Sequence, residues 1–231
     1  AVTETVGGGS VVIELRGPLL RVRCGLIPLF SCPCLEGPGE SSTGFLRATI
    51  GYDRPAVPEL PDLTVVADAL HASIANRPIR SATAPGPLAV RGTPDELAAL
   101  VGQRVRSIRR RGKFLLMDLE RDAIAWNPML TGRFQLAARG TKLPAKTAVV
   151  LGFGARDRGP ADAAAWTRGA AWLPADDADP EIRYRDPTQM GKVYLQPAGV
   201  DRPVPGLGGA EQGPDADDPA LTLEVWRDRI R

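Results

Sequence analysis

Aromatic residues and histidine are scarce in this chain. Phe, Trp and Tyr make up 5% of its 231 residues, and His71 is the single histidine. There are three cysteines, Cys24, Cys32 and Cys34, and none has a histidine or a fourth cysteine near it in the sequence. An odd number of cysteines cannot complete a disulfide framework, and this spacing does not match a structural zinc site. We therefore expect no metal in this chain.

Long hydrophobic runs are also missing. No apolar stretch approaches the roughly 18 residues that a membrane-spanning helix needs. The first residues lack the basic start and the apolar stretch of a secretory signal. These absences predict a soluble, cytoplasmic protein without a membrane partner. Hydrophobic residues at 43% and charged residues at 24% are ordinary globular values, which exclude disorder of the whole chain.

Glycine and proline are abundant, with 25 and 22 residues, and they divide the chain into regions. Residues 1–57 contain a triple glycine, a Cys-Pro-Cys step and a Gly/Ser-rich run, with no hydrophobic period long enough to build a core. We interpret them as a poorly ordered extension, or as a stretch that is not part of the working protein. Residues 58–200 contain helix and strand patterns. Residues 201–220 resemble a linker, and 221–231 begin a helix of a second domain that is cut short.

Two helices are predicted before the strands. Residues 60–74 have apolar side chains at helical spacing and acids near the start, where the helix dipole favours them. A shorter helix follows Thr93, which is a good N-cap, with Pro94 at the first helical position. Glu96 completes a capping box, and Gly102 follows the end.

After Gly102 the pattern changes to short strands with turns between them. The predicted strands cover residues 105–108, 114–119, 123–126, 132–137, 147–153, 182–185 and 192–195. Strands in series after helices predict an α+β domain, here an antiparallel β-sandwich with two flanking helices.

Positive charge is concentrated around the first predicted hairpin. No acidic residue lies between Glu96 and Asp118, where the basic residues are Arg104, Arg106, Arg109, Arg110, Arg111 and Lys113. Such a cluster, taken alone, is more often a solvated face than a DNA contact. Further evidence is needed to assign it a partner.

That evidence comes from three motifs in a fixed order. Residues 58–63 read Pro-Glu-Leu-Pro-Asp-Leu, 110–116 read Arg-Arg-Gly-Lys-Phe-Leu-Leu, and 186–191 read Asp-Pro-Thr-Gln-Met-Gly. Together they resemble the N-terminal catalytic domain of the formamidopyrimidine-DNA glycosylase / endonuclease VIII family over residues 58–200. The final helix resembles the first helix of that family's second domain.

The resemblance implies a monomeric DNA glycosylase with AP lyase activity that acts on damaged duplex DNA. Pro58 is then the nucleophile, because its secondary amine can attack C1′, expel the base and form a Schiff base. Glu59 would move protons at the sugar. Lys113 would hold a phosphate near the lesion, while Arg110 and Arg111 attract the DNA backbone. Whether excision is followed by strand cleavage stays open.

Several family positions differ in this sequence. The family's His-Leu-Gly-Met-Thr-Gly segment reads Asn-Pro-Met-Leu-Thr-Gly at 127–132, so that Asn127 replaces a phosphate-contacting His and Leu130 falls on a gap-filling Met. In the last motif, Gln189 replaces an Arg and Met190 replaces a Phe. Leu130 and Met190 are still apolar side chains that could fill the place of a flipped base. Because the Arg partner of the orphaned base is lost, the lesion preference stays open.

The implied chemistry also requires a free amine at Pro58. With Val57 attached, this nitrogen is an amide whose lone pair is delocalised. A free α-amino group, in contrast, has a pKa of about 7.7–8.0. We therefore expect translation to begin at position 57, with an initiator residue that is then removed.

The family's helix–two-turn–helix and zinc finger have no counterpart in the sequence up to Arg231. We therefore expect no zinc cofactor in this chain. Two alternatives remain open. One is an inactive, truncated family remnant with weak, non-specific DNA binding. The other is an unrelated small α+β binding domain.

Overall fold

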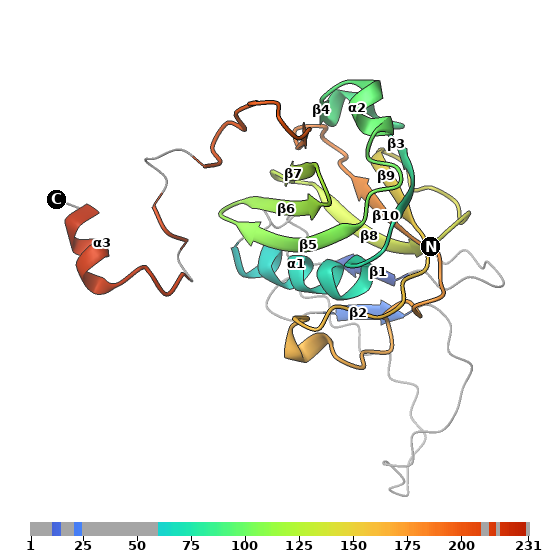
Figure 1. Cartoon of the computed structure of the whole chain (residues 1–231), viewed down its shortest axis with the longest axis horizontal. Helices are drawn as coiled ribbons and strands as arrows, with labels where there is room; N and C mark the ends of the chain where they lie inside the picture. Colours follow the sequence, from blue (N-terminus) through green and yellow to red (C-terminus); the bar gives the residue numbers. More distant parts are fainter. Residues whose placement is uncertain (1–10, 15–20, 25–59, 209–212, 216–217, 230–231) are drawn as a thin grey trace, which may run out of the picture.

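The computed structural model describes residues 11–14, 21–24, 60–208, 213–215 and 218–229. Their strands form two sheets (Figure 1). The five-stranded sheet has the order β4-β11-β7-β6-β5. Its strands are β4 (Val90–Arg91), β5 (Val105–Arg111), β6 (Phe114–Leu119), β7 (Ala123–Asn127) and β11 (Lys192–Gln196). Only the β4–β11 pair in this sheet is parallel.

The six-stranded sheet has the order β2-β1-β8-β10-β9-β3 and is antiparallel throughout. Its strands are β1 (Val11–Glu14), β2 (Arg21–Cys24), β3 (Ile79–Thr83), β8 (Arg133–Ala138), β9 (Thr147–Phe153) and β10 (Pro180–Arg185). Two of these strands, β1 and β2, fall within the predicted extension 1–57. The rest of that extension, with Cys32 and Cys34, lies outside the described residues, so its assignment stays a prediction.

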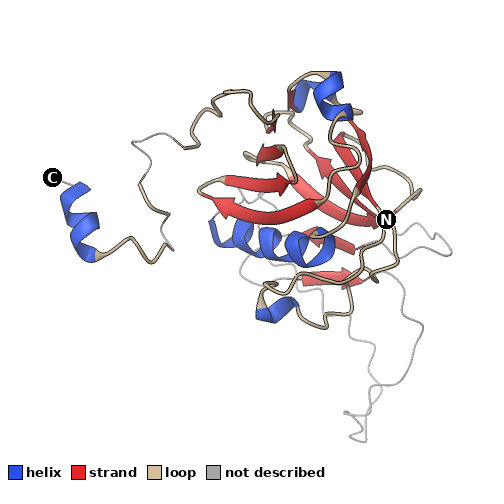
Figure 2. Cartoon of the chain, in the orientation of Figure 1, coloured by secondary structure: helices blue, strands red, loops and turns tan. Residues whose placement is uncertain are grey.

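Helix α1 (Leu60–Ile74) packs against β5 (Figure 2). The hydrophobic core contains side chains from α1 and from both sheets. The apolar positions of the predicted helix are buried, among them Leu63, Val66, Leu70 and Ile74. They join inward-facing side chains of β6 such as Met117 in one cluster. The first half of α1 therefore buries one side at a period of about 3.6, while its second half, from Ala69, is buried on all sides. In β6 a period of 2 buries alternate residues from Leu115 onward.

The second predicted helix, α2 (Pro94–Ala98), has the predicted capping box. The Glu96 N–H donates to Thr93 Oγ1 at 3.1 Å, and the Thr93 N–H donates to Glu96 Oε2 at 2.9 Å. The Glu96 carboxylate also accepts from Arg202 at 2.7 Å, which ties the segment after β11 to this helix. The final helix, α3, covers Leu223–Arg229.

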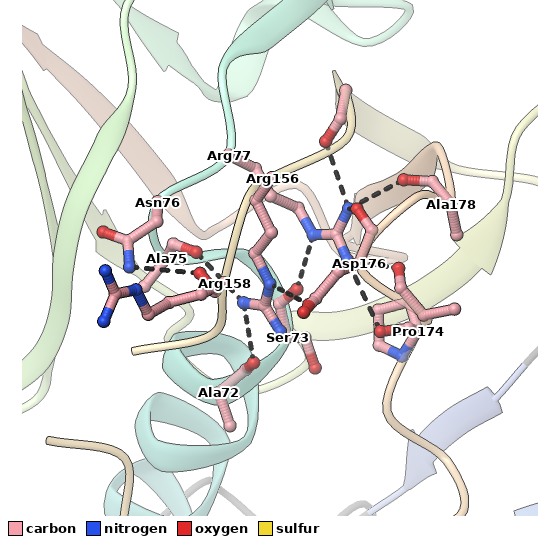
Figure 3. Close-up of polar contacts among 12 residues, drawn as sticks. Ala72, Ser73, Ala75, Asn76, Arg77, Arg156, Arg158, Pro174, Asp176 and Ala178 are labelled. Atoms are coloured by element: carbon pink, nitrogen blue, oxygen red, sulfur yellow. Dashed lines mark hydrogen bonds and ion pairs between the residues drawn. The ribbon is translucent and has the colours of Figure 1, made fainter. Parts of the chain in front are cut away.

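Two buried arginines hold the long connection between β9 and β10 against the end of α1 (Figure 3). Arg77 donates to the backbone carbonyls of Ser73, Gly154, Pro174, Ala175, Asp176 and Ala178. Arg156 donates to Asp176 Oδ1 at 2.6 Å and to the carbonyls of Ala72 and Ala75. Burial first, and then the positive charge of Arg156, lower the pKa of Arg77 to about 10.

The predicted α+β class and the antiparallel sheets are confirmed, and every predicted strand is present. Four strands of the structure were not predicted: β1 and β2, which lie within the predicted extension, and β3 and β4. In β3 only Ile79 is fully buried, so the strand has no alternation of apolar and polar residues that would predict it. Strand β4 is only two residues long, which is too short for a pattern. In the described part of the chain, no helix combines the length and the apolar character needed to cross a bilayer.

Candidate nucleic-acid interface

Strand register brings distant parts of the sequence to one end of the five-stranded sheet. Leu115 in β6 pairs with Trp126 in β7, and Asn127 pairs with Lys192 in β11. The start of β6, the end of β7 and the start of β11 therefore lie side by side. Lys113, which precedes β6, belongs to the same end. The register thus joins the basic hairpin to the segments at 127–132 and 186–191.

The basic residues of the β5–β6 turn differ in what surrounds them. The Arg110 side chain is 5% exposed and donates to Thr64 Oγ1 at 2.9 Å and to Asp215 Oδ1 at 3.0 Å. Arg111 donates to the carbonyl of Gly213 at 2.9 Å and also pairs with Asp215. Lys113 is exposed and makes no hydrogen bond or ion pair with the residues that the structure describes. Of the three, Lys113 is the one whose charge faces solvent.

The contact between Arg110 and Thr64 also locates the start of α1. Thr64 lies in the second turn of this helix, which begins at Leu60. The first turns of α1 therefore lie beside the basic hairpin. Pro58 and Glu59, the predicted nucleophile and proton carrier, lie outside the described residues, and their roles stay predictions.

A buried carboxylate joins the two loops at this end of the molecule. Asp186, which is 1% exposed, accepts from Thr131 Oγ1 at 2.5 Å and from the Gly191 N–H at 2.6 Å. Thr188 donates to the same carboxylate at 3.2 Å. Since charge-assisted hydrogen bonds are the stronger ones, this network fixes the loop 127–132 against the loop 186–191.

Close packing explains the glycines at the ends of these loops. The hydroxyl of Tyr184 lies where a Cβ would stand on either Gly132 or Gly191. Any larger residue at these positions would push the loops away from Tyr184. Burial raises the pKa of this tyrosine above its ordinary range, so that the hydroxyl stays protonated.

The joined loops present apolar side chains to solvent. Met129, Leu130 and Met190 are 40%, 42% and 45% exposed. Met129 and Gln189 have positive φ angles of 49° and 57°, a conformation that is uncommon for side chains of this kind. The loops thus hold a methionine, a leucine and a second methionine out of the core at some conformational cost.

Asn127 and Gln189 differ in their local roles. The Asn127 side-chain oxygen accepts from the Met129 N–H at 3.3 Å and so supports the turn. Gln189 is exposed, and its backbone carbonyl accepts from Lys192 Nζ at 3.3 Å. Lys192 also donates to the carbonyl of Met190 at 2.9 Å, so this cation is used to hold the loop.

Sequence reasoning did not assign a role to Thr131, Asp186 or Asp215. Thr131 and Asp186 belong to the two motif segments, so the motifs themselves contained the signal. Asp215 lies in the Pro/Gly/Asp-rich stretch 201–220, and nothing local marks it as a partner of residues that lie about one hundred positions earlier. Within the described ranges, no group of three or more His, Cys, Asp or Glu side chains is placed to hold a metal ion.

These features define an α+β sandwich with cations and exposed apolar side chains gathered at one end, a combination suited to a nucleic acid. Residues 57–193, more than half of the chain, match the family model described as the formamidopyrimidine-DNA glycosylase N-terminal domain. The chain belongs to this family.

Curated relatives agree with this assignment. The chain is 30% identical over 176 residues to a formamidopyrimidine-DNA glycosylase of Geobacillus kaustophilus, a match that covers 75% of this chain and 55% of the relative. A second formamidopyrimidine-DNA glycosylase, from Acidithiobacillus ferrooxidans, is 31% identical to this chain over 160 residues. That match covers 64% of this chain and 57% of the relative. The chain thus spans about half the length of the curated relatives it matches.

The solved structures that resemble this chain include a complex of the Lactococcus lactis protein FPG (MutM) with DNA containing FAPY-dG. The sequence identity is 21%, the TM-score is 0.48, and the match covers 60% of this chain and 44% of that one.

Proposed function

We propose that this chain provides the catalytic half of a DNA repair glycosylase that removes damaged, oxidised bases from duplex DNA. The proposal rests mainly on one observation. Family segments that are far apart in sequence, at 110–116, 127–132 and 186–191, lie at one end of the sandwich, where the Asp186 network joins the last two. The DNA-binding roles of the individual residues follow from this arrangement.

Lys113 is the proposed phosphate ligand, because its charge is exposed beside the ends of β6 and β7. Leu130 and Met190 are the proposed wedges. A base must leave the stack before its sugar can be attacked, and apolar side chains inserted between base steps are a common way to fill the gap. Their exposure in the free protein supports this role, because they leave no hole in the core when they enter DNA.

In the proposed chemistry, the amine of Pro58 forms a bond to C1′ of the damaged nucleotide, and the bond between C1′ and the base breaks. The base leaves with the bonding electrons and takes up a proton. Glu59 moves protons between the sugar and its surroundings. The nitrogen of Pro58 then loses its proton and its lone pair forms the C=N bond, while the C1′–O4′ bond breaks and O4′ takes up a proton. The ring-opened sugar remains attached to Pro58 as an iminium, from which strand cleavage by elimination can follow. This chemistry requires that Pro58 be the first residue of the working protein.

The second candidate is a non-catalytic member of the family with weak, non-specific DNA affinity. Two observations favour it, and the first is that Arg110 and Arg111 are already paired with Asp215. Gln189 also replaces the arginine that faces the orphaned base in the family. The two candidates differ in whether a covalent intermediate forms.

Borohydride trapping tests the proposal, because reduction converts an iminium into a stable adduct that shifts a band on a gel. Two versions of the protein are compared on abasic-site and oxidised-purine duplexes: the whole chain, and a processed form that begins at Pro58. We expect an adduct only from the form that begins at Pro58. Absence of an adduct from both would refute the enzymatic proposal and favour the non-catalytic one.

A further inference from the structure

The turn between β5 and β6 contains an anion site that the chain itself occupies. Asp215 Oδ1 accepts from the Gly112 N–H at 2.9 Å and from Arg110 Nη1 at 3.0 Å. Its Oδ2 lies 3.1 Å from the same N–H and 3.5 Å from Arg111 Nη1. The Asp215 side chain is 14% exposed, so the contact is largely shielded from water.

The donors around Asp215 are those that bind phosphate. Two guanidinium groups and one backbone N–H converge on an anion with two oxygens, and phosphodiesters are contacted by the same kinds of donor. A glycine at positive φ presents its N–H at the turn, since φ of Gly112 is 54°. The carboxylate and a phosphate cannot occupy this site together.

We propose that Asp215 is an intramolecular latch that competes with a backbone phosphate of DNA for this site. The inference rests on the proposed function, because it assumes that DNA is the ligand of this end of the molecule. Residues 213–215 lie in the Pro/Gly/Asp-rich stretch after β11, and the hydrophobic core includes none of them. Asp215 can therefore leave without unpacking the sandwich, while exposed Lys113 makes the first contact with DNA.

The site can be tested without DNA by using inorganic phosphate as the probe. In Asp215→Ala, phosphate at millimolar concentration should shift the Gly112 amide resonance in a ¹⁵N–¹H spectrum and raise the melting temperature. The wild type should show neither effect, and chloride at equal ionic strength should have none on either protein. If the Gly112 resonance of the variant does not respond to phosphate, the anion site is refuted, whatever the DNA results are.

The competition is tested with the full chain and a fluorescent duplex at low salt. We expect Asp215→Ala to bind about tenfold more tightly than the wild type, since a charge-assisted contact no longer has to be broken. Asp201→Asn removes one negative charge from the same stretch and serves as the control. Asp215→Asn keeps an oxygen for the Gly112 N–H, and it should lie between the wild type and the alanine variant.

The outcomes separate the two proposals. Equal affinity of Asp215→Ala and Asp201→Asn, or weaker binding by Asp215→Ala, would overturn the latch and make Asp215 a structural tether. If no variant binds duplex but phosphate still shifts Gly112 in Asp215→Ala, the anion site stands and the proposed DNA function fails.

Discussion

Neighbouring cations in this family member have different physical surroundings. Arg110 and Arg111 are enclosed by hydrogen bonds, whereas Lys113 is exposed. Arginine suits the enclosed positions because its planar fork makes several directed hydrogen bonds, while lysine is a compact charge on a flexible stem. The exposed lysine is therefore the residue whose loss should affect DNA binding with the least effect on stability.

Lys113→Gln should weaken binding to duplex DNA by about fivefold to tenfold, because one phosphate contact is lost. The loss should be similar for all DNA sequences, since phosphate contacts contain no base information. Arg121→Gln, which removes an exposed cation at the opposite end of β6, is the matched control. Fluorescence anisotropy would measure both, and an equal loss for the two variants would contradict the assignment.

Arg77 shows the opposite case of a charge that stabilises the fold. Arg77→Met should lower the free energy of unfolding by about 3–5 kcal/mol, because several buried carbonyls lose their donor. Urea denaturation would give this value. Arg106→Met, on an exposed position of β5, should change stability by less than about 0.5 kcal/mol. A small effect at Arg77 would mean that water replaces the guanidinium.

At the scale of helices and strands, the local sequence predicted an element correctly wherever a capping motif or a run of apolar residues determines it. The capping box around Glu96 and the strand 147–153 were predicted with their correct positions. The end of β5 was not, since Arg109, Arg110 and Arg111 have no apolar alternation. They are in a strand because β6 pairs with them, with Arg111 opposite Phe114. Edge strands such as β3 are equally hard to predict from sequence, because the strand that pairs with them lies far away in the chain.

The cap of α2 also predicts a dependence of stability on pH. Hydrogen bonds from Arg202 and then from the Thr93 N–H lower the pKa of Glu96 below its ordinary value of 4.5. A carboxyl whose pKa is lower in the folded state stabilises the fold above its unfolded pKa and loses that effect as the pH falls through the folded pKa. The melting temperature of Glu96→Gln should thus be below that of the wild type at pH 7.

The difference between Glu96→Gln and the wild type should shrink as the pH falls below about 4.5. Thermal melts at pH 7 and pH 3 would measure it. Asp95→Asn is the control, because it removes a carboxylate from the same turn that makes no hydrogen bond or ion pair with another described residue. A difference that stays constant with pH would show that Glu96 contributes through packing rather than charge.

At the scale of the whole molecule, the sequence predicted which segments contain the family motifs, but it did not predict the polar contacts that connect distant segments. The order of three motifs was enough to identify the family. The contact of Asp215 with Gly112 and the clamp around Arg77 join residues about one hundred positions apart, and no periodic pattern records such pairs. The folded arrangement of this chain therefore depends on long-range polar contacts that a pattern of apolar residues cannot reveal.

The charge distribution of the whole molecule leads to the last prediction. The formal net charge is only +2, so the proposed attraction to DNA has to come from the local cations at one end of the sandwich. If about three phosphates are neutralised there, log K should fall with log salt at a slope of about −2.7, which weakens binding about 40-fold between 50 and 200 mM salt.

Anisotropy titrations at several salt concentrations would give this slope, and the variants locate its origin. Lys113→Gln should make the slope less steep by about 0.9, since one phosphate contact fewer is made. Arg121→Gln changes the net charge by the same amount and should leave the slope unchanged. Tight binding that does not depend on salt would contradict an electrostatic interface, and it would place the main DNA contacts on the apolar loops around Leu130 and Met190 instead.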